Sequence, residues 1–282
     1  MLPHSRVMDT PDTTIATKDS SDKASEKQTE KLTAREWLWS EFKFFSKLSV
    51  FILAFLTIVW GHYKIPSESM QPTLEVGDHL YVSKFPYGIS KHSLPLLLHK
   101  LPLPEGRLFS RVPDRGDVVV FRNPQSGIVM IKRVAGIPGD RIQVRQGQLY
   151  INDEEIIRQK IDSRLYREHV SQLPRSVTVY QQTFPGMKKD FTIYERSDSY
   201  PLDNTPIFIV PENSLFFMGD NRDNSIDSRD TRRDINGVQI GPGVVHMNYV
   251  IGRADRMMFS LKKCNRNEDL YCPPKGRWME KL

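Results

Sequence analysis

D-V-V-V-F-R-N-P-Q-S-G-I-V-M-I-K-R-V, from Asp117 to Val134, contains two runs of β-prone apolar residues. The first run, Asp117 to Arg122, has the continuous apolar pattern of a buried strand, and the second, Ile128 to Val134, follows Gly127. Short pieces of the same kind recur in the chain after Tyr63, where turn residues separate them and long helical patterns are missing. We therefore expect a mainly β fold for this part of the protein.

A lysine, Lys132, lies inside the second apolar run. On an extended strand Met130 and Val134 share its face. Ile128 lies on the same face, whereas Arg133 points to the other side. One interpretation is a strand lysine whose ammonium group reaches the surface. The other is a buried lysine that acts as a base, because burial disfavours the charged form of an amine.

Two serines, Ser67 and Ser69, lie upstream in the segment I-P-S-E-S-M-Q-P-T-L, from Ile65 to Leu74. Taken alone, this segment is consistent with a polar linker. A serine hydroxyl is a weak nucleophile unless a base takes its proton, and that base is usually histidine. None of the seven histidines lies in a recognisable triad pattern. A serine–lysine pair is a known alternative, and Lys132 is the candidate for it.

A third segment, G-D-N-R-D-N-S-I-D-S-R, extends from Gly219 to Arg229. By itself it can be a polar turn or a cation-binding loop. A calcium site of the EF-hand type is disfavoured, because no glycine and distal glutamate follow at the required spacing. We expect neither a metal ion nor another cofactor.

Together these three segments resemble the type I signal peptidases, which are membrane-bound serine proteases that remove signal peptides from exported proteins. The resemblance extends from about Tyr63 to Ala254, with a diverged middle part. It implies a membrane-anchored catalytic β-domain with an inserted β-rich subdomain, preceded by one transmembrane helix. It also implies cleavage of preproteins after small-x-small motifs by a serine nucleophile and a neutral lysine base.

The resemblance implies a role for each residue of the catalytic pair. Ser69 would be the nucleophile and Lys132 the general base. The hydroxyl of Ser67 and the backbone N–H of Ser69 would form the oxyanion hole, whose donors stabilise the charge that develops on the scissile carbonyl oxygen. Glu68 departs from the family pattern, because a small residue is common between the two serines.

The third segment would support this pair. The resemblance implies that Ser225 orients the lysine amine through a hydrogen bond. Asp227 and Arg229 would form a structural ion pair behind the amine, and Ser228 would add a further hydrogen bond. The remaining polar residues, which would shape the loop, are Asp220, Asn221, Arg222, Asp223 and Asn224.

Cleavage after a small-x-small motif requires two shallow apolar pockets in the enzyme. They would accept the small side chains of the preprotein at the first and third positions before the scissile bond. Each position that matches the family's pocket residues is also suited to an ordinary core. These positions are Tyr63, Ile65, Pro66, Met70, Leu74, Val120, Met130 and Ile131.

An uncharged apolar run, Leu48 to Trp60, follows an aromatic and basic lead-in. Alone it is short for a transmembrane helix, which needs about 20 residues, but a helix from Phe44 to Tyr63 reaches that length. Basic residues precede the run, which favours a cytoplasmic N-terminus and a periplasmic catalytic domain. A buried core helix is one alternative. A cleaved signal peptide is the other, and it is disfavoured because the region before the run is far too long.

The chain is therefore expected to have five parts. They are a disordered cytoplasmic tail (1–33), an interfacial lead-in with a transmembrane helix (34–63), a catalytic β-domain (64–140 and 211–256), an inserted β-subdomain (141–210) and a C-terminal extension (257–282).

Composition narrows the class of protein further. A hydrophobic fraction of 39% is too low for a polytopic membrane protein. A net charge of +6 suits an anionic membrane surface better than nucleic acid, because a basic helix is missing.

Cys264 and Cys272 cannot make a structural zinc site, but they can form a disulfide outside the cytoplasm. Ser90 to Pro113 is a Pro- and Leu-rich insert that either packs on the core or dips into lipid.

The resemblance places the protein in the bacterial cytoplasmic membrane as a single-pass enzyme. Its expected partners are signal peptides of secreted preproteins, the lipid bilayer and the secretion translocase. A self-cleaving repressor is the rival enzyme, but it needs a DNA-binding domain that the N-terminal tail cannot form. A membrane-anchored, inert β-rich scaffold is the rival of another class, and it has no reason to keep Ser69, Lys132 and Ser225 together.

Overall fold

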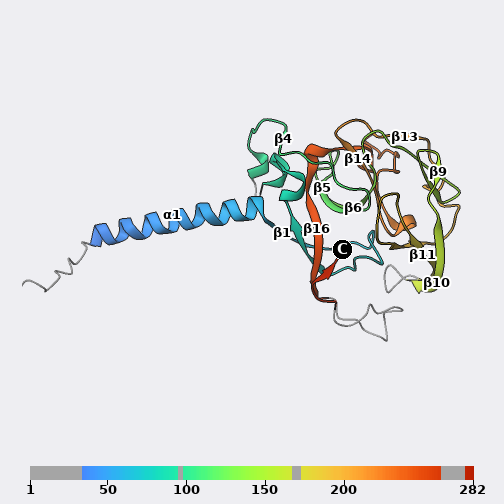
Figure 1. Ribbon diagram of the computed structural model, residues 1–282, viewed down its shortest axis with the longest axis horizontal. Coiled ribbons are helices and arrows are strands. Elements are labelled where there is room, and N and C mark those ends of the chain that lie inside the picture. The colour runs from blue at the N-terminus through green and yellow to red at the C-terminus, as the bar shows by residue number, and fades with distance from the viewer. Residues whose placement is uncertain (1–33, 95–97, 167–172, 262–276) are drawn as a thin grey trace, which may run out of the picture. The chain divides into compact units, whose positions relative to one another are not determined.

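The computed structural model describes residues 34–94, 98–166, 173–261 and 277–282 (Figure 1). The chain divides into two compact units between Ser49 and Val50. The helices are α1 (Ala34–Ile58) and the short 3-10 turns η1 (Phe85–Tyr87), η2 (Lys91–Ser93), η3 (Leu98–Lys100), η4 (Arg222–Asn224) and η5 (Met247–Tyr249). The strands are β1 (Trp60–Lys64), β2 (Asp78–Ser83), β3 (Ile89–Ser90), β4 (Arg107–Leu108), β5 (Val118–Arg122), β6 (Val129–Gly136), β7 (Arg141–Arg145), β8 (Gln148–Ile151), β9 (Glu154–Glu155), β10 (Arg158–Tyr166), β11 (Arg175–Gln182), β12 (Phe191–Glu195), β13 (Phe208–Ile209), β14 (Ser214–Met218), β15 (Val245–His246), β16 (Val250–Ser260) and β17 (Glu280–Lys281).

The helix α1 ends earlier than the sequence predicts. It has 25 residues and stops at Ile58, and the strand β1 begins two residues later. The predicted helix from Phe44 to Tyr63 is therefore wrong at its C-terminal end, because the backbone of β1 is hydrogen-bonded to β2. Among the described residues, no helix is both long enough and apolar enough to cross a lipid bilayer.

An eight-stranded antiparallel sheet forms the main part of the second unit. Its strand order is β1-β2-β16-β5-β6-β14-β15, and β17 pairs with β16. The sheet passes the boundary predicted at residue 256, since β16 continues to Ser260 and β17 pairs with Arg256 and Met257. The expected C-terminal extension thus contributes to this sheet. The two cysteines in the extension lie outside the described residues.

Two smaller sheets, with orders β13-β7-β8-β9 and β10-β11-β12, lie within the predicted insert. Their buried side chains, such as Ile142, Leu149 and Ile193, belong to one apolar cluster with Ala135 of β6 and Phe216 of β14. The insert therefore shares a core with the main sheet. A fourth, two-stranded sheet pairs β3 with β4.

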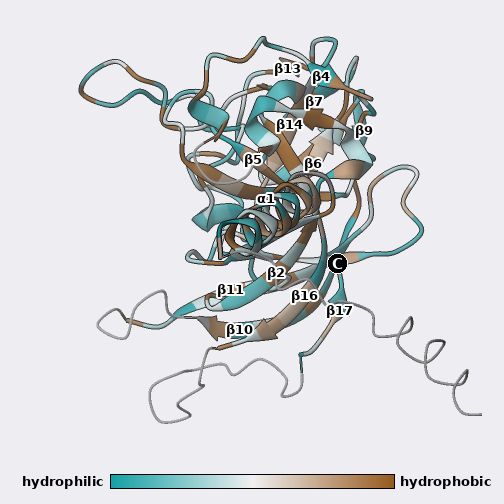
Figure 2. Ribbon diagram, turned by 90° about the vertical axis from the view of Figure 1, so that its left-hand side faces the viewer, coloured by the Kyte–Doolittle hydropathy of each residue, from teal (hydrophilic) through white to brown (hydrophobic). Residues whose placement is uncertain are grey.

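The predicted buried strand, β5, packs on both of its faces. Val118 and Val120 belong to one apolar cluster, whereas Val119 and Phe121 belong to a second cluster on the opposite face. Phe121 stacks on Phe217 of β14 with ring centroids 4.2 Å apart. Burial on both faces explains why β5 has a continuous apolar pattern instead of an alternating one. The strand β14, which pairs with β6, is coloured as hydrophobic in Figure 2.

Candidate active site

The two serines lie on a loop between β1 and β2. Its ends are joined by main-chain hydrogen bonds, in which Ile65 N donates to Asp78 O (2.8 Å) and Gly77 N donates to Ile65 O (2.9 Å). Met70 and Leu74 are fully buried and anchor the loop in the apolar cluster beside Val118 and Val120. This packing holds the segment between Ile65 and Leu74 in place, so that the serine positions are set by the core beneath them.

The nucleophile and the base predicted from the sequence are in contact. Lys132 Nζ donates a hydrogen bond to Ser69 Oγ, and both side chains are buried, with exposed fractions of 3% and 8% for the two residues. Ser67 Oγ lies 3.4 Å from Ser69 Oγ, and Ser67 itself is exposed. Two residues that are 63 positions apart in the chain are thus brought within proton-transfer distance.

Burial changes the ionisation of Lys132. Removal from water lowers the pKa of its amine from 10.5 to about 8, against the opposing effect of the Asp227 and Asp220 carboxylates. Val119 faces Lys132 across the strand pair, and Val134 on the same face is fully buried. The predicted apolar surroundings are therefore present, except that Ile128 lies outside β6 and is 64% exposed.

The segment from Gly219 to Arg229 holds the serine loop through several hydrogen bonds. Asn221 N donates to Ser69 O (3.1 Å), and the Asn221 side-chain amide donates to Glu68 O (3.2 Å). Asn224 donates to the carboxylate of Glu68 at 3.3 Å. Glu68, which departs from the family pattern, therefore has a local role as an acceptor.

A buried ion pair stabilises this segment from within. Arg229 Nε and Nη2 donate to the two carboxylate oxygens of Asp227, each at 2.9 Å, and both side chains are almost fully buried. Gly219 N also donates to Asp227, and Arg229 donates to Arg222 O. Burial alone would raise the pKa of Asp227, but the ion pair with Arg229 outweighs burial and lowers this pKa. The ion pair that the resemblance implied is present in the structure.

The two serines of this segment differ in their contacts. Ser228 Oγ accepts a hydrogen bond from Phe217 N at 2.9 Å, which attaches the segment to β14. Ser225 Oγ is buried and makes no hydrogen bond within the described part of the chain, so the predicted bond to the lysine amine is not formed. The amine is directed at Ser69 instead, and Ser225 packs against Gly219, where an added methyl group would lie 2.2 Å from its Oγ.

A second buried ion pair was not predicted. Arg133, on the opposite face of β6 from Lys132, donates to both carboxylate oxygens of Asp220 at 2.8 and 2.6 Å. Its guanidinium also donates to Gly116 O and lies 4.1 Å from the centroid of the Phe191 ring. The sequence contained a signal for this pair, because an arginine directed into a core needs a carboxylate partner.

Most of the predicted pocket positions belong to the core. Ile65, Met70, Leu74 and Val120 are at most 2% exposed and pack together, so they present almost no surface to solvent. The partly buried Tyr63 and Ile131 pack against the same cluster. Two positions lie elsewhere, since Met130 packs on the other face of the sheet and Pro66 is exposed. The alternation of side chains along β6 separates Met130 from Ile131.

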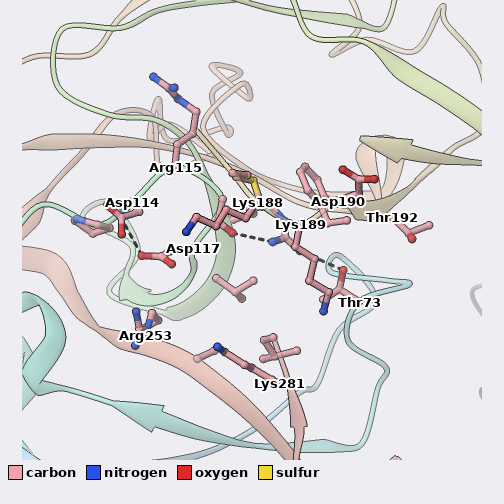
Figure 3. Close-up of a pocket in the computed structure, with 18 of the residues that line it drawn as sticks. Thr73, Asp114, Arg115, Asp117, Lys188, Lys189, Asp190, Thr192, Arg253 and Lys281 are labelled. Carbon is pink, nitrogen blue, oxygen red and sulfur yellow. Dashed lines mark hydrogen bonds between the residues drawn. The ribbon is translucent and has the colours of Figure 1, made fainter. Parts of the chain in front are cut away.

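A cavity of about 1070 Å³ lies away from the dyad. Figure 3 shows its charged lining, which includes Arg115, Lys188, Lys189 and Arg253. Thr73 follows Ser69 by four positions and also lines this cavity, but Ser69 and Lys132 do not. The cavity is therefore separate from the contact between Ser69 and Lys132.

One group of carboxylates is arranged so that it could hold a cation. Glu195, Asp203 and Asp223 each have an oxygen within 4.8 Å of the others. Burial, with help from the charge of Asp223, raises the pKa of Asp203 to about 6. Because the guanidinium of Arg158 forms an ion pair with Glu195, part of the negative charge is neutralised within the chain.

Comparisons with known proteins agree with the three-segment pattern. Residues 37–259 match the family model described as signal peptidase, peptidase S26. A signal peptidase I from Rickettsia conorii is 33% identical over 79% of this chain and 79% of its own length. A signal peptidase I from Rickettsia bellii is 34% identical over 84% of this chain and 77% of its own. A crystal structure of a signal peptidase I from Enterococcus faecalis is 24% identical, with coverage of 51% of this chain and 97% of that one and a TM-score of 0.27.

The Arg133–Asp220 pair gives a test of the site's architecture. Asp220→Ala should lower the free energy of unfolding by about 3–5 kcal/mol, because it leaves the guanidinium buried without a counter-charge. Asp162→Ala is the control, since it removes the carboxylate of an exposed ion pair with Arg164 and should change stability little. Urea unfolding of the detergent-solubilised variants measures both. Equal stabilities of the two variants would contradict this assignment.

Proposed function

This chain belongs to the signal peptidase family, peptidase S26, and we propose that it is a membrane-bound serine endopeptidase that cleaves signal peptides from exported preproteins after small-x-small motifs. The hydrogen bond between Lys132 and Ser69 inside a buried site is the observation that supports this proposal most directly. Burial lowers the pKa of Lys132 to about 8, so the neutral amine that a Ser–Lys mechanism requires becomes available as the pH rises toward this value.

In the proposed reaction, neutral Lys132 takes the proton of Ser69 as Oγ attacks the scissile carbonyl carbon. The resulting oxyanion accepts hydrogen bonds from the backbone N–H of Ser69 and from the hydroxyl of Ser67. The lysine ammonium then gives its proton to the departing amine, which leaves an ester on Ser69. A water molecule, deprotonated by the lysine, attacks this ester and restores the serine.

The neighbouring loop supports this reaction by position. Asn221 holds the carbonyl of Ser69 through its backbone N–H. The hydroxyl of Ser225 is buried and unpaired among the described residues, and it is available to accept a hydrogen bond from the lysine ammonium once Ser69 has been acylated. Asp227 is already paired with Arg229, which limits the extent to which its charge stabilises the ammonium form.

The proposed preference for small residues is supported by the core beneath the serine loop. Met70, Leu74 and Val120 are packed to near-zero exposure, so little depth remains below the scissile bond. Tyr63 and Ile131 are partly buried at the border of this cluster and are the residues we assign to the substrate pockets. A bulky side chain would have to displace packed core atoms, which is costly.

The helix α1 supports attachment of the enzyme to lipid. Between Trp37 and Phe55 its side chains are mainly aromatic and aliphatic, yet all of them except that of Glu41 are exposed, and the Lys43 ammonium lies 5.7 Å from the Trp39 ring centroid. Aromatic and basic side chains together favour a membrane interface. In this proposal the bilayer and the secretion translocase are partners, and tethering of enzyme and preprotein to one surface raises their effective concentration. The exposed apolar side chains of α1 are Trp37, Leu38, Trp39, Phe42, Phe44, Phe45, Leu48, Val50, Phe51, Ile52, Leu53 and Phe55.

Removal of the nucleophile tests the proposed reaction. Ser69→Ala should abolish cleavage of a purified preprotein while the fold persists, because the hydroxyl is needed for chemistry only. Ser67→Ala should slow cleavage by about 10²–10³-fold, the usual loss for one oxyanion donor. Gel analysis of the processed preprotein measures both rates. Near wild-type cleavage by Ser69→Ala would rule out the assignment.

The pH dependence of cleavage reports the ionisation of the proposed base, Lys132. Only the deprotonated amine of Lys132 is active, so kcat/KM should rise with pH and reach half of its plateau near pH 8. Lys132→Arg should be inactive, because a guanidinium does not lose its proton in this range. Substantial cleavage by this variant would mean that another group is the base.

Lys84 provides the control for this measurement. Burial also lowers the pKa of its amine to about 8, but it donates to Ser93 O rather than to the dyad. In Lys84→Met the acid limb of the kcat/KM profile should therefore stay at the same pH. A displaced acid limb in this variant would mean that the titrating group is Lys84 and not Lys132.

The side of the membrane on which the catalytic unit lies is also testable. Signal peptides emerge on the extracytoplasmic side, so the proposed catalytic unit belongs there. Protease added to sealed spheroplasts should digest the part of the chain after Tyr63. Immunoblotting with an antibody against the catalytic unit measures this loss, and a cytoplasmic marker protein controls for sealed membranes. Full protection of the catalytic unit would contradict an extracytoplasmic location.

A further inference from the structure

The C-terminal segment, residues 277–282, lies against the loop that carries Ser69. It is attached to the main sheet because β17 pairs with β16 and Leu282 N donates to Asp255 O at 3.1 Å. The Leu282 side chain packs on the apolar cluster that contains Met70 and Leu74 of the serine loop. The segment therefore supports this loop from a distant part of the chain.

Arg277, at the beginning of this segment, bonds to the serine loop at two points. Its Nη2 donates to the main-chain oxygen of Thr73, and its Nη1 donates to Asp78 Oδ2, each at 2.9 Å. The arginine side chain is 12% exposed, and the Asp78 side chain is fully buried. Asp78 Oδ2 also accepts a hydrogen bond from Glu75 N at 2.8 Å. One guanidinium thus joins the second half of the loop to the residue at which β2 begins.

The contact at Thr73 reaches Ser69 through the loop backbone. Leu74 N donates to Met70 O at 2.9 Å, which closes a turn that starts one residue after Ser69. Ser69 O accepts a hydrogen bond from Asn221 N at 3.1 Å. The turn is therefore held at both of its ends by residues from distant parts of the chain.

Thr73 is also held on its side chain. Its hydroxyl donates to Asp220 Oδ2, and Arg133 Nη2 donates to the same hydroxyl at 3.3 Å. The buried ion pair thus fixes the side chain of Thr73, whereas Arg277 fixes its carbonyl. A planar guanidinium suits this task, because its rigid fork bonds two acceptors in one geometry.

A small displacement of the serine loop has a large effect on a Ser–Lys pair. Lys132 Nζ and Ser69 Oγ are in hydrogen-bond contact, and proton transfer depends on this contact. A misplacement of about 1 Å in a reacting group costs about 10²-fold in rate. A residue that fixes the loop therefore controls the rate of the chemical step without touching the substrate.

We infer that Arg277 is a positioning residue for Ser69, whose guanidinium joins Thr73 O to Asp78 and so keeps the serine hydroxyl within reach of Lys132. This inference rests on the proposed function for its effect on cleavage. Arg277 and Thr73 line the cavity of about 1070 Å³, in which Figure 3 labels Thr73, whereas Ser69 and Lys132 do not line it. Arg277 thus acts through the loop.

Steady-state cleavage of a purified preprotein in detergent tests this role. Arg277→Ala should lower kcat by about 10-fold to 10²-fold and leave KM near the parental value, because the loss affects the geometry of the reacting groups. Glu280→Gln is the matched control. It removes the exposed ion pair between Arg277 and Glu280 but keeps both contacts with the serine loop, so its kcat should be parental. A parental kcat in Arg277→Ala would overturn the inference.

Chemical rescue separates positioning from a general loss of stability. Because Arg277 lines the cavity, guanidinium ion from solution can enter the space that its side chain leaves in Arg277→Ala. Guanidinium chloride, far below the concentration that unfolds the variant, should raise its kcat, whereas sodium chloride should not. The acid limb of the kcat/KM profile should stay near pH 8, because Arg277 bonds to the loop and not to Lys132. A kcat loss without rescue, together with a limb at higher pH, would overturn the inference, because water would then reach a loosened core.

Arg277→Lys tests the guanidinium fork in a chain that retains the charge. Its ammonium still lies opposite the buried carboxylate of Asp78, so this variant should fold even where Arg277→Ala does not. An ammonium lacks the planar fork that fixes two acceptors together. We therefore expect a reduced kcat at a parental melting temperature. A parental kcat would show that charge alone is sufficient and would overturn the role of the fork.

Hydrogen exchange separates this inference from the proposed function, because it requires no cleavage. Mass spectrometry should show faster amide exchange in residues 65–78 of both Arg277 variants than in Glu280→Gln, with unchanged exchange in β8. Equal exchange in the three variants would overturn the inference. If the parent chain cleaved no preprotein while the Arg277 variants showed faster exchange in the loop, the proposed function would fail and the contact between Arg277 and the loop would be supported.

Discussion

Contact between a buried lysine amine and a serine hydroxyl is the interaction on which the rest of this structure depends. A lysine on an exposed strand is an ammonium at neutral pH and cannot accept a proton. Because Lys132 faces Val119 and lies beside Val134, removal from water lowers its pKa to about 8, so a much larger fraction of its amine is neutral near this pH than for an exposed lysine. The apolar clusters around β5 and β6 therefore provide the dry surroundings that the chemistry needs, in addition to stability.

Two ion pairs on opposite sides of β6 neutralise the carboxylates that are buried in this core beside Lys132. Arg229 neutralises Asp227 behind the amine, and Arg133 neutralises Asp220 on the other face of the strand. Each pair is satisfied by further main-chain hydrogen bonds, which is the condition under which buried charges are tolerated. Because Arg133 follows Lys132 and Asp220 is followed by Asn221, whose N–H bonds to the carbonyl of Ser69, the Arg133–Asp220 pair also connects the strand of Lys132 with the loop of Ser69.

The predicted pocket positions show a limit of inference from sequence. Ile65, Met70, Leu74 and Val120 match the family's pocket, and each is also an apolar residue that a core can accept. The structure packs them under the serine loop, while Met130 faces the other side of the sheet. Apolar character is the same signal for a pocket floor and for a core, so the sequence has no means to separate them.

The sequence by itself determined the β class and the two strands around Lys132, because these depend on local periodicity, and the family resemblance of three short segments predicted the pairing of that lysine with Ser69. Tertiary structure alone decided the partner of Arg133, the lack of a hydrogen bond from Ser225 to any residue that the structure describes, and the end of α1 at Ile58. Arg133 and Asp220 are 87 positions apart, and Trp60 joins a strand because β2 offers it backbone partners. Such outcomes depend on the register between distant segments, which is set when the whole core packs and which no local pattern specifies.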